Sequence, residues 1–510
     1  MEEEKLKLYD YKKIIPSELN FNFSLTDLEQ KIFSFFLDHN YKNSIFRVAG
    51  GWVRDKLLSI HNEDIDITID NITGQEYLSL LQSQTKDINS AQFKIIKNTN
   101  SKSSKLETAT INLYGKDIDI VNLRKEIYEE NSRIPKISAG TAEEDAFRRD
   151  ITINCLFYNI NKKIVEDFTN KGIDDLKKGI INTPKDAKIS FNEDPLRVLR
   201  VIRFGTRFGF NFDKNILDNL YISDEFKNII SFQRIEKEFS KMMENDRFYS
   251  SIYILYKFNY LEYFLNFSEL DINFVNKNEN IDDKLFINSA VNLMLIKSYL
   301  DRNNYLKISK EKESLILTKE IYKLNNYSCL LLPYKNIQVY ESKNKSCPLS
   351  KIILSKKFFL QKSEINDIMI NIEGSSEFLN IIKSEINRYN ISLFLMKYKF
   401  KNIFNIIKLC ACEEYLKCIN SNGIIEDINN DIMKICNKFN EVISFIEKEN
   451  LEKIENMKPI VDGKEIKKIF NIKDGKEIKK YIDLVIKEQI NNPNITKEKC
   501  IEIIKNQNKQ

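Results

Sequence analysis

Residues 46–70, FRVAGGWVRDKLLSIHNEDIDITID, carry the pattern of a strand, a double-glycine turn, a short helix, a loop and a second strand. Because side chains alternate along a strand, residues 64–69 place Asp64 and Asp66 on one face and three isoleucines on the other. The two carboxylates then lie about 6.5–7 Å apart at Cα. Such a pair is typical either of a solvated strand face or of an oxygen-rich site for a hard cation such as Mg²⁺.

The glycines upstream favour the second interpretation. Gly50 and Gly51 follow an apolar strand and open a helix, where glycine lets a ligand approach the backbone and free N–H groups attract phosphate. Arg54, in the first turn, would add a forked guanidinium to the same anion. A phosphate cradle beside an acidic strand predicts a nucleoside triphosphate site, although no GxxxxGK[ST] loop is present.

Composition sets the broad class of the protein. A chain of 510 residues is too long for one core and predicts about two to four domains. The net charge is only +5, but 79 Lys and Arg leave room for local basic tracks on nucleic acid. The eight scattered cysteines lack zinc-site spacing and suggest reduced thiols. No signal peptide, transit peptide or spanning segment is expected, so we predict a cytoplasmic protein with no membrane partner, with nuclear or organellar pools as alternatives.

Glycine and proline divide the chain into two kinds of structure. Nine of the 13 glycines precede residue 210, and residues 196–458 contain only two prolines, Pro333 and Pro348. An α+β head followed by a long helical part is therefore expected, with the best boundary near 165–190. A helix is also expected over 24–40, capped by Ser24, with an apolar face of Leu28, Ile32, Phe35 and Phe36.

A second acidic strand is expected over 116–124, KDIDIVNLR, with Asp117 and Asp119 on one face. On its own this pattern favours a structural role. In the same domain as Asp64 and Asp66, it can supply a third carboxylate, either as a base toward an attacking hydroxyl or to complete a metal site.

Two arginines and an acid precede a strand-like segment at 151–157. Arg148, Arg149 and Asp150 either form a surface ion pair of little energetic value or bind a triphosphate. In the second case Asp150 or Asn154 would bond a ribose hydroxyl.

The segment 192–204, NEDPLRVLRVIRF, predicts a helix with Asp194 as its cap and Pro195 in its first position. Four arginines would form one basic stripe along it, namely Arg197, Arg200, Arg203 and Arg207. Asp194 is either a plain cap or half of a base-reading pair with Arg197. The Asp194 carboxylate would accept a hydrogen bond and the Arg197 guanidinium would donate beside it. Cytosine and adenine each present an amino donor next to a ring acceptor and so match this pair, whereas the edges of guanine and uracil have the opposite polarity.

The motifs occur in a fixed order: GGWVRD with DIDI, an acidic strand ahead of LR, RRD, DFTNKGIDDL (167–176), EDPLRVLR and RIEKEF (234–239). This set closely resembles a class II CCA-adding tRNA nucleotidyltransferase, nearest the eukaryotic branch. The resemblance covers most of 24–240 and continues weakly at 459–500. It implies a polymerase-beta-like α+β nucleotidyltransferase head followed by an all-α neck, body and tail. The implied parts are a helical lead-in (1–40), the head (41–165), a neck with the base-recognition helix (166–260), the body (261–420) and a tRNA-binding tail (421–510).

The resemblance also implies roles. Asp64 and Asp66 would bind the metals, Mg²⁺ by expectation, and Asp119 rather than Asp117 would be the third catalytic acid. Residues 167–176 would be a hinge, Arg234 to Glu238 would brace the neck helix, and 125–140 would be a flexible loop. The implied nucleotide-binding residues are Gly50, Gly51, Arg54, Arg148, Arg149, Asp150, Asn154, Glu193, Asp194, Arg197 and Arg200.

The implied activity is addition of CCA to the 3′ end of tRNA from CTP and ATP, without a nucleic-acid template. The alternatives are a poly(A) polymerase, an enzyme that adds only CC or only A, and a non-catalytic RNA-binding protein; either a monomer or a homodimer is possible. In the tail, residues 474–479 (DGKEIK) replace the GPxxG turn that is frequent in the family, so Lys476 and Lys479 would make its contacts electrostatically. Further basic surface is expected at Lys351, Lys356, Lys357 and Lys362.

Overall fold

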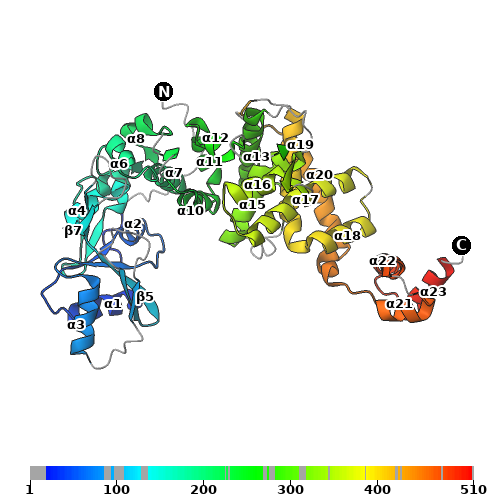
Figure 1. Ribbon diagram of the computed structural model, residues 1–510, viewed down its shortest axis with the longest axis horizontal. Coiled ribbons are helices and arrows are strands. Elements are labelled where there is room, and N and C mark those ends of the chain that lie inside the picture. The colour runs from blue at the N-terminus through cyan, green and yellow to red at the C-terminus, as the bar shows by residue number, and fades with distance from the viewer. Residues whose placement is uncertain are drawn as a thin grey trace. The chain divides into compact units, whose positions relative to one another are not determined.

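The computed structural model describes residues 19–85, 93–96, 108–127, 136–223, 226–227, 230–267, 273–274, 282–308, 318–342, 345–384, 386–419, 423–425, 428–472 and 475–507. The chain forms two compact units (Figure 1). Unit 1 comprises Met1–Met242 and Tyr253–Tyr260, and unit 2 comprises Met243–Ile252 and Leu261–Gln510. The finer division into head, neck, body and tail stays a prediction.

Unit 1 is built on a seven-stranded mixed sheet of order β3-β4-β5-β2-β1-β8-β9. All neighbouring strands in it are antiparallel except β2 and β5, which are parallel. A separate hairpin joins β6 (Arg124–Ile127) to β7 (Lys136–Ala139). The sheet strands are β1 (Phe46–Ala49), β2 (Asp66–Ile69), β3 (Phe93–Ile96), β4 (Thr108–Leu113), β5 (Lys116–Asn122), β8 (Phe157–Asn159) and β9 (Ile164–Glu166).

Helix α1 (Asp27–Asp38) covers part of this sheet, and it begins later than predicted. Its cap is Thr26 rather than Ser24, because Thr26 and Glu29 bond each other's backbone N–H groups in a capping box. Phe36 packs on Phe46 of β1 and on Tyr77 of the neighbouring helix α3 (Gly74–Gln84). Of the predicted apolar face, Ile32 and Phe36 are buried, whereas Leu28 and Phe35 are only half-buried.

Unit 1 contains further helices besides α1 and α3. They are α2 (Gly51–Leu57), α4 (Ala142–Phe147), the 3-10 helix η3 (Thr152–Asn154), α5 (Gly172–Lys178), α6 (Ala187–Glu193), α7 (Arg197–Phe208), α8 (Lys214–Asn219) and α10 (Phe232–Met243). A two-stranded parallel pair, β10 (Ile180–Ile181) with β11 (Asn211–Phe212), adjoins α7.

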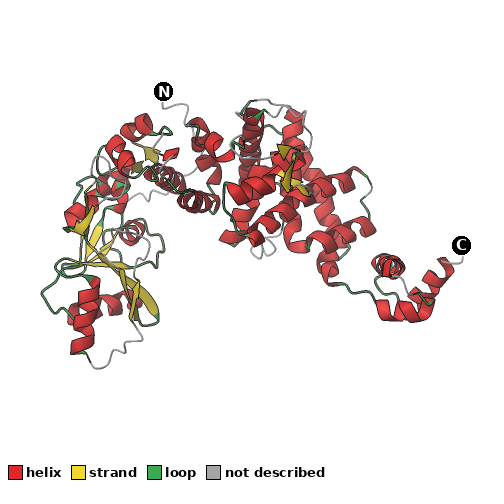
Figure 2. Ribbon diagram, in the orientation of Figure 1, coloured by secondary structure: helices red, strands yellow, loops and turns green. Residues whose placement is uncertain are grey.

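Unit 2 is mostly helical (Figure 2). It also holds a three-stranded sheet of β12 (Asn273–Phe274), β13 (Gln338–Ser342) and β14 (Lys345–Pro348). The predicted fold class is confirmed, and this small sheet is an addition that the breaker-poor composition gave no sign of. The helices after residue 247 are α11 (Phe248–Lys257), of which residues 253–257 belong to unit 1, α12 (Tyr260–Leu265), α13 (Asp283–Asn303), α15 (Lys319–Leu331), α16 (Leu349–Lys356), α17 (Lys362–Lys383), α18 (Arg388–Tyr398), α19 (Phe400–Ile419), α20 (Asp431–Lys448), α21 (Gly463–Phe470), α22 (Gly475–Asn491) and α23 (Lys497–Gln507), with 3-10 helices η4 (Leu332–Asn336) and η5 (Leu451–Asn456).

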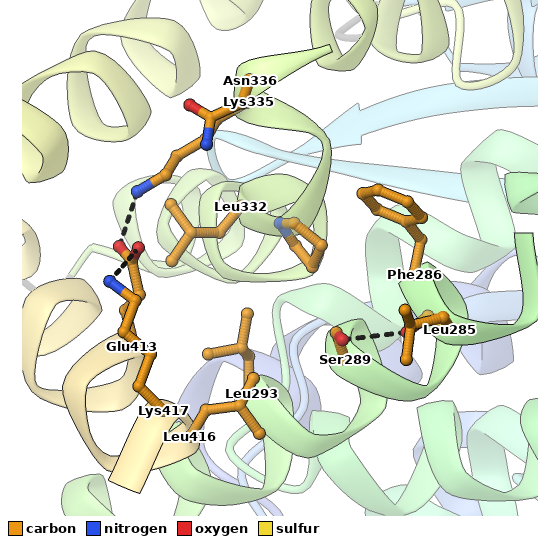
Figure 3. A pocket seen from close by; sticks show the side chains of 11 residues that line it. Leu285, Phe286, Ser289, Leu293, Leu332, Lys335, Asn336, Glu413, Leu416 and Lys417 are labelled. Carbon is orange, nitrogen blue, oxygen red and sulfur yellow. Dashed lines mark hydrogen bonds and ion pairs between the residues drawn. The ribbon is translucent and has the colours of Figure 1, made fainter. Parts of the chain in front are cut away.

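A cavity of about 220 Å³ lies between α13, η4 and α19 of unit 2 (Figure 3). Leu293, Leu332 and other apolar side chains line it, and at its rim Glu413 accepts hydrogen bonds from Lys335 at 2.6 Å and Lys417 at 2.8 Å. The cavity is smaller than the roughly 300–1,000 Å³ of most ligand pockets, and its charged side chains are already paired with one another. We assign it no ligand.

The structure also bears on the predictions about membrane spans and cysteines. Within the described ranges, no helix is long and apolar enough to cross a membrane. All eight cysteines are free thiols, and only Cys418 is exposed.

Candidate active site

The turn between β1 and α2 places Gly50 against Arg149. Gly50 has φ +72°, which favours glycine, and a Cβ built there would lie 2.6 Å from Nη1 of Arg149. The same Nη1 donates to the carbonyl oxygen of Asn154 at 3.0 Å. The predicted glycine turn and the predicted arginine motif therefore meet at one place.

Arg54 lies beneath this turn and is buried, with 3% of its surface exposed. Its Nε donates to Oδ1 of Asp55 at 2.7 Å, its Nη2 lies 2.7 Å from the same oxygen, and its Nη1 donates to Oδ1 of Asn154. The guanidinium lies 4.8 Å from the ring centroid of Phe208 on α7. Each nitrogen of Arg54 thus has a protein partner, which leaves at most one N–H on each of Nη1 and Nη2 for a triphosphate.

Two carboxylates lie side by side at the centre of the sheet. In the parallel pairing of β2 with β5, Asp66 is the register partner of Asp119, so their Cα atoms are about 4.8 Å apart. Oδ1 of Asp119 accepts a hydrogen bond from Oγ1 of Thr110 at 2.7 Å. Partial burial of the carboxyl group raises the pKa of Asp66. The charges of Asp119 and Asp64 raise this pKa further, whereas the charge of Arg149 lowers it. Excess negative charge is concentrated at this point.

The first acidic strand is shorter than predicted. It begins at Asp66, and Asp64 lies in the preceding loop, where its N–H donates to Oδ1 of Asn62 at 2.9 Å. That bond holds the backbone in a turn, so the strand ladder starts only after it. The predicted division of side chains between two faces holds, because Asp64 and Asp66 are exposed whereas the three isoleucines of 64–69 are buried.

Asp117 faces a different partner. It pairs in register with Asn112, whose Nδ2 donates to its Oδ1 at 2.6 Å. Of the two acids on β5, only Asp119 is in register with Asp66.

One buried carboxylate, which the sequence pattern missed as a site residue, orients both arginines of the RRD motif. Asp145 is 1% exposed. Its Oδ1 accepts from Arg148 Nε at 2.9 Å and Nη2 at 2.5 Å, and its Oδ2 accepts from Arg149 Nε at 3.0 Å and Nη2 at 2.8 Å. The spacing DxxRR, with the acid three and four residues before the arginines on one helix, is the signal that could have identified it.

Asp150 links the head to helix α7. Its Oδ1 accepts from Nδ2 of Asn154 at 3.1 Å, and its Oδ2 accepts from Nε of Arg200 at 2.8 Å. Burial by itself would raise the pKa of Asp150, but Arg200 and the bond from Asn154 lower it to about 2. The carboxylate is ionised at neutral pH.

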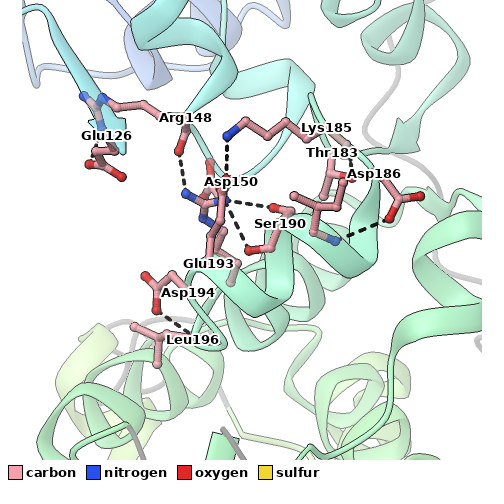
Figure 4. A network of polar contacts seen from close by, with 12 residues as sticks. Glu126, Arg148, Asp150, Thr183, Lys185, Asp186, Ser190, Glu193, Asp194 and Leu196 are labelled. Atoms are coloured by element: carbon pink, nitrogen blue, oxygen red, sulfur yellow. Dashed lines mark hydrogen bonds and ion pairs between the residues drawn. The ribbon is translucent and has the colours of Figure 1, made fainter. Parts of the chain in front are cut away.

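The predicted base-recognition helix starts later than expected. Helix α7 begins at Arg197, and Asp194 lies between α6 and α7 in an extended conformation. The predicted positions of Asp194 as helix cap and Pro195 as first helical residue are therefore wrong. Oδ1 of Asp194 still accepts from the backbone N–H of Leu196 at 3.2 Å (Figure 4). Its Oδ2 accepts from Nη2 of Arg234 at 2.9 Å.

The predicted basic stripe is mostly neutralised. Oε2 of Glu238 on α10 accepts from Nε of Arg203 at 2.6 Å, and its Oε1 accepts from Nη1 of Arg200 at 3.4 Å. Arg197 is 5% exposed and bonds to Glu193. Glu238 contacts Arg200 and Arg203 of α7, as predicted for the 234–238 segment, whereas Arg234 contacts Asp194 ahead of that helix. Arg197, Arg200 and Arg203 of the predicted stripe each have an acidic partner.

Several other expectations meet the structure only in part. The loop predicted at 125–140 has described residues only at 125–127 and 136–140, and the hinge role of 167–176 stays a prediction. Asp474 lies outside the described residues, while Lys476 and Lys479 lie in the first turns of α22. Lys357 is buried, with its Nζ 5.7 Å from the ring centroid of Tyr263, so its assignment to a basic surface is wrong.

Comparisons with known proteins agree with these observations. Residues 46–182 match the family model described as Poly A polymerase head domain. The mitochondrial CCA tRNA nucleotidyltransferase of Saccharomyces cerevisiae is 32% identical, with 94% of this chain and 93% of that protein covered. Its counterpart in Candida glabrata is 30% identical over 94% and 96% of the two chains.

Solved structures show the same fold at low sequence identity. The CCA-adding enzyme of Bacillus stearothermophilus in complex with CTP aligns with a TM-score of 0.62 at 14% identity, covering 95% of this chain and 98% of that one. The CCA-adding enzyme of Thermotoga maritima complexed with tRNA aligns with a TM-score of 0.59 at 18% identity, covering 95% and 96%.

Proposed function

Because the chain belongs to the family of the CCA tRNA nucleotidyltransferases, we propose that it completes the 3′ end of tRNA with CCA, using CTP and ATP. It is a nucleotidyltransferase that acts in tRNA processing. One observation in the structure carries the proposal: the register of Asp66 with Asp119, beside a glycine turn on which Arg149 lies. Carboxylates next to an arginine-lined turn provide both a metal-binding edge and a place for a triphosphate.

Enzymes of this family generally use divalent metal ions, and we propose Mg²⁺ as the ion. The described residues contain no cluster of three acidic, His or Cys ligands. Mg²⁺ does not require one, because it binds through one or two carboxylates together with substrate phosphates. The crowded charge that raises the pKa of Asp66 fits a cation held by Asp66 and Asp64. When bound, the ions would stabilise charge on the transferring phosphate and on the pyrophosphate.

The side chains of the head would then perform the transfer. The 3′ oxygen of tRNA attacks the α-phosphorus, the bond to the β-phosphate oxygen breaks, and pyrophosphate leaves. Asp119 takes the proton of the attacking hydroxyl at Oδ2, because its Oδ1 is already held by Thr110. Arg149, Gly50 and Gly51 bind the triphosphate.

The remaining predicted residues would position the nucleotide. Asp150 and Asn154 contact the sugar, with Arg148 in support. The buried Arg54 would support the turn at Gly50 through its contacts with protein groups. Asp194 and Arg197 select the base, and Glu193 and Arg200 hold them in place.

Single-nucleotide incorporation tests the function. The protein is incubated with Mg²⁺ and tRNA transcripts that end before the first C, after the second C or in full CCA, with labelled CTP and ATP supplied separately. Growth to CCA followed by a stop is the expected result. Long A tails would indicate a poly(A) polymerase, CC or A addition alone would indicate a partial enzyme, and no incorporation would indicate a non-catalytic RNA-binding protein.

We further propose that the protein works in the cytoplasm and in an organelle. Support comes from the yeast relatives, which are named as mitochondrial enzymes. Cell fractionation with an antibody to the protein tests this. Signal confined to one compartment would contradict the dual location.

A further inference from the structure

The carboxylate of Glu193 is shared between two cations. Its Oε1 accepts from Nζ of Lys185 at 2.5 Å, and its Oε2 accepts from Nη1 of Arg197 at 3.0 Å (Figure 4). The side chains of Glu193 and Arg197 are 12% and 7% exposed, so solvent screens these contacts weakly. In this arrangement Arg197 contacts only one oxygen of the carboxylate, Oε2.

Three further acceptors fix the guanidinium of Arg197. Nη1 donates to Oγ of Ser190 at 3.0 Å and to its carbonyl oxygen at 3.3 Å, and Nη2 donates to the carbonyl oxygen of Arg148 at 2.7 Å. Ser190 is fully buried. A guanidinium has five N–H donors. Nε and one hydrogen of Nη2 have no partner among the described residues, so they remain free for a base.

We propose that Lys185 and Ser190 are positioning residues that determine nucleotide selectivity by orienting Arg197. This inference rests on the proposed function. An arginine and a carboxylate favour a bidentate pair, with two N–H groups on two oxygens. By occupying Oε1, Lys185 prevents Glu193 from forming that pair. Ser190 holds Nη1, so the two free donors point away from Glu193 toward the base.

The side chain of Lys185 can be tested without breaking its loop. The backbone around it is held independently, because its carbonyl oxygen accepts from Oγ1 of Thr183 at 2.6 Å and helix α6 is capped by Asp186. Glu193 is the only ion-pair partner of Lys185 among the described residues. Removing the ammonium therefore changes the charge at Glu193 and leaves the turn in place.

The experiment measures CTP and UTP incorporation separately, on tRNA that ends before the first C, for Lys185→Met, Lys185→Arg and Ser190→Ala. In Lys185→Met, Glu193 closes on Arg197, so the KM for CTP should rise about tenfold, while kcat changes less than about twofold. The preference for CTP over UTP should fall by a similar factor. Lys185→Arg should restore both values. Ser190→Ala loses one bond to a charged donor, and its KM for CTP should rise about fivefold.

Lys214→Met is the matched control, since Lys214 forms an ion pair with Asp218 at 2.6 Å and its side chain is 84% exposed. It should retain wild-type kinetics. Wild-type KM and selectivity in Lys185→Met would overturn the positioning role and leave the proposed function intact. An equal loss for every nucleotide together with a lower Tm would also overturn it, because that is the result of general destabilisation. Wild-type protein that adds no C would overturn the proposed function itself.

Discussion

At the scale of single residues, the charges of the site depend on one another. Asp145 is buried, which by itself would raise its pKa, but Arg149 and Arg148 together lower the pKa of this carboxylate. The ionised Asp145 in turn holds Arg149 on Gly50. The arginine that faces the expected triphosphate is therefore oriented by an acid that touches no part of the substrate.

Asp145→Asn keeps the shape of this side chain and removes its charge. Both arginines lose their shared partner, so the KM for CTP and for ATP should rise by about tenfold or more. The free energy of unfolding should fall by about 3 kcal/mol, because two half-buried arginines lose their shared counter-ion and Arg148 keeps, among the described residues, only Glu126, at 3.6 Å. Steady-state kinetics and urea unfolding measure the two effects. Glu143→Gln, on an exposed position of the same helix, is the control, and an equal effect there would contradict the explanation.

Asp66→Asn should separate stability from activity. Because burial and the nearby Asp119 and Asp64 raise the pKa of Asp66, removing its charge should raise the Tm of the metal-free protein. Nucleotide incorporation should be lost, while tRNA binding stays near the wild-type value. Thermal unfolding in EDTA and a filter-binding assay provide the measurements. Lost tRNA binding would mean that the site is misassigned.

Asp150 gives stability a defined pH dependence. Its pKa is about 2 in the folded protein and about 3.9 when unfolded, so its ionised form favours folding. The contribution, about 2–3 kcal/mol, is present above pH 3.9 and is lost as the pH falls toward 2. The difference in unfolding free energy between wild type and Asp150→Asn should therefore shrink over that window. A difference that is constant with pH would contradict this.

At the scale of elements, α7 is held by a helix far from it in the sequence. Glu238 on α10 binds both Arg200 and Arg203, and Arg200 also reaches Asp150 in the head. The orientation of the predicted base-reading helix therefore depends on the register of α10.

Glu238→Gln should weaken this connection. Arg203, with 9% of its side chain exposed, loses its ionic partner, and unfolding free energy should fall by about 2–4 kcal/mol. The KM for CTP should rise because α7 moves relative to Asp150. Kinetics and urea unfolding report both changes. Glu236→Gln, two residues earlier on α10, removes the charge of a half-buried side chain that accepts from Ser240 rather than from Arg200 or Arg203. It should have a smaller effect, and a comparable loss there would rule out a specific brace.

The same contacts show what the sequence could and could not predict. Alternation identified the acidic strands, and glycine spacing identified the turn at Gly50, because both are local properties of the chain. The start of α7 was misplaced because Asp194 bonds two residues ahead and leaves the backbone extended. Most counter-ions of the basic stripe were missed because Glu238 on α10 and Asp150 in the head are distant in the sequence, and long-range pairs leave no periodic pattern. Glu193, four residues before Arg197, is the one local counter-ion among the three.

At the scale of the whole molecule, a short segment of the first half of the chain belongs to unit 2. Residues 243–252 include Phe248, which is fully buried and packs on Tyr322 with ring centroids 5.9 Å apart. Nζ of the buried Lys297 lies 5.0 Å from the Phe248 ring centroid and 2.7 Å from Asp301. Unit 2 is thus completed by residues that precede its main span.

Truncation tests this arrangement. The fragment 243–510 should unfold cooperatively, whereas 261–510 should bind hydrophobic dyes and aggregate. The shorter fragment lacks the buried side chains of Phe248, Tyr249 and Ile252, which are worth about 2 kcal/mol each. Calorimetry and light scattering compare the two. Equal stability of both fragments would show that residues 243–252 contribute nothing to unit 2.

The parallel pairing of β2 with β5 has a consequence for the order of folding. The first turn of α2 is closed by local bonds from the N–H groups of Val53 and Arg54 to the carbonyl oxygen of Gly50, but Asp66 meets Asp119 only after the chain has passed through α3, β3 and β4. Closing so long a loop is slow compared with forming local contacts. We expect pulsed hydrogen exchange to protect α2 before β5. A nascent head would then carry its glycine turn before it has the paired carboxylates, so it could not begin catalysis until the sheet is complete.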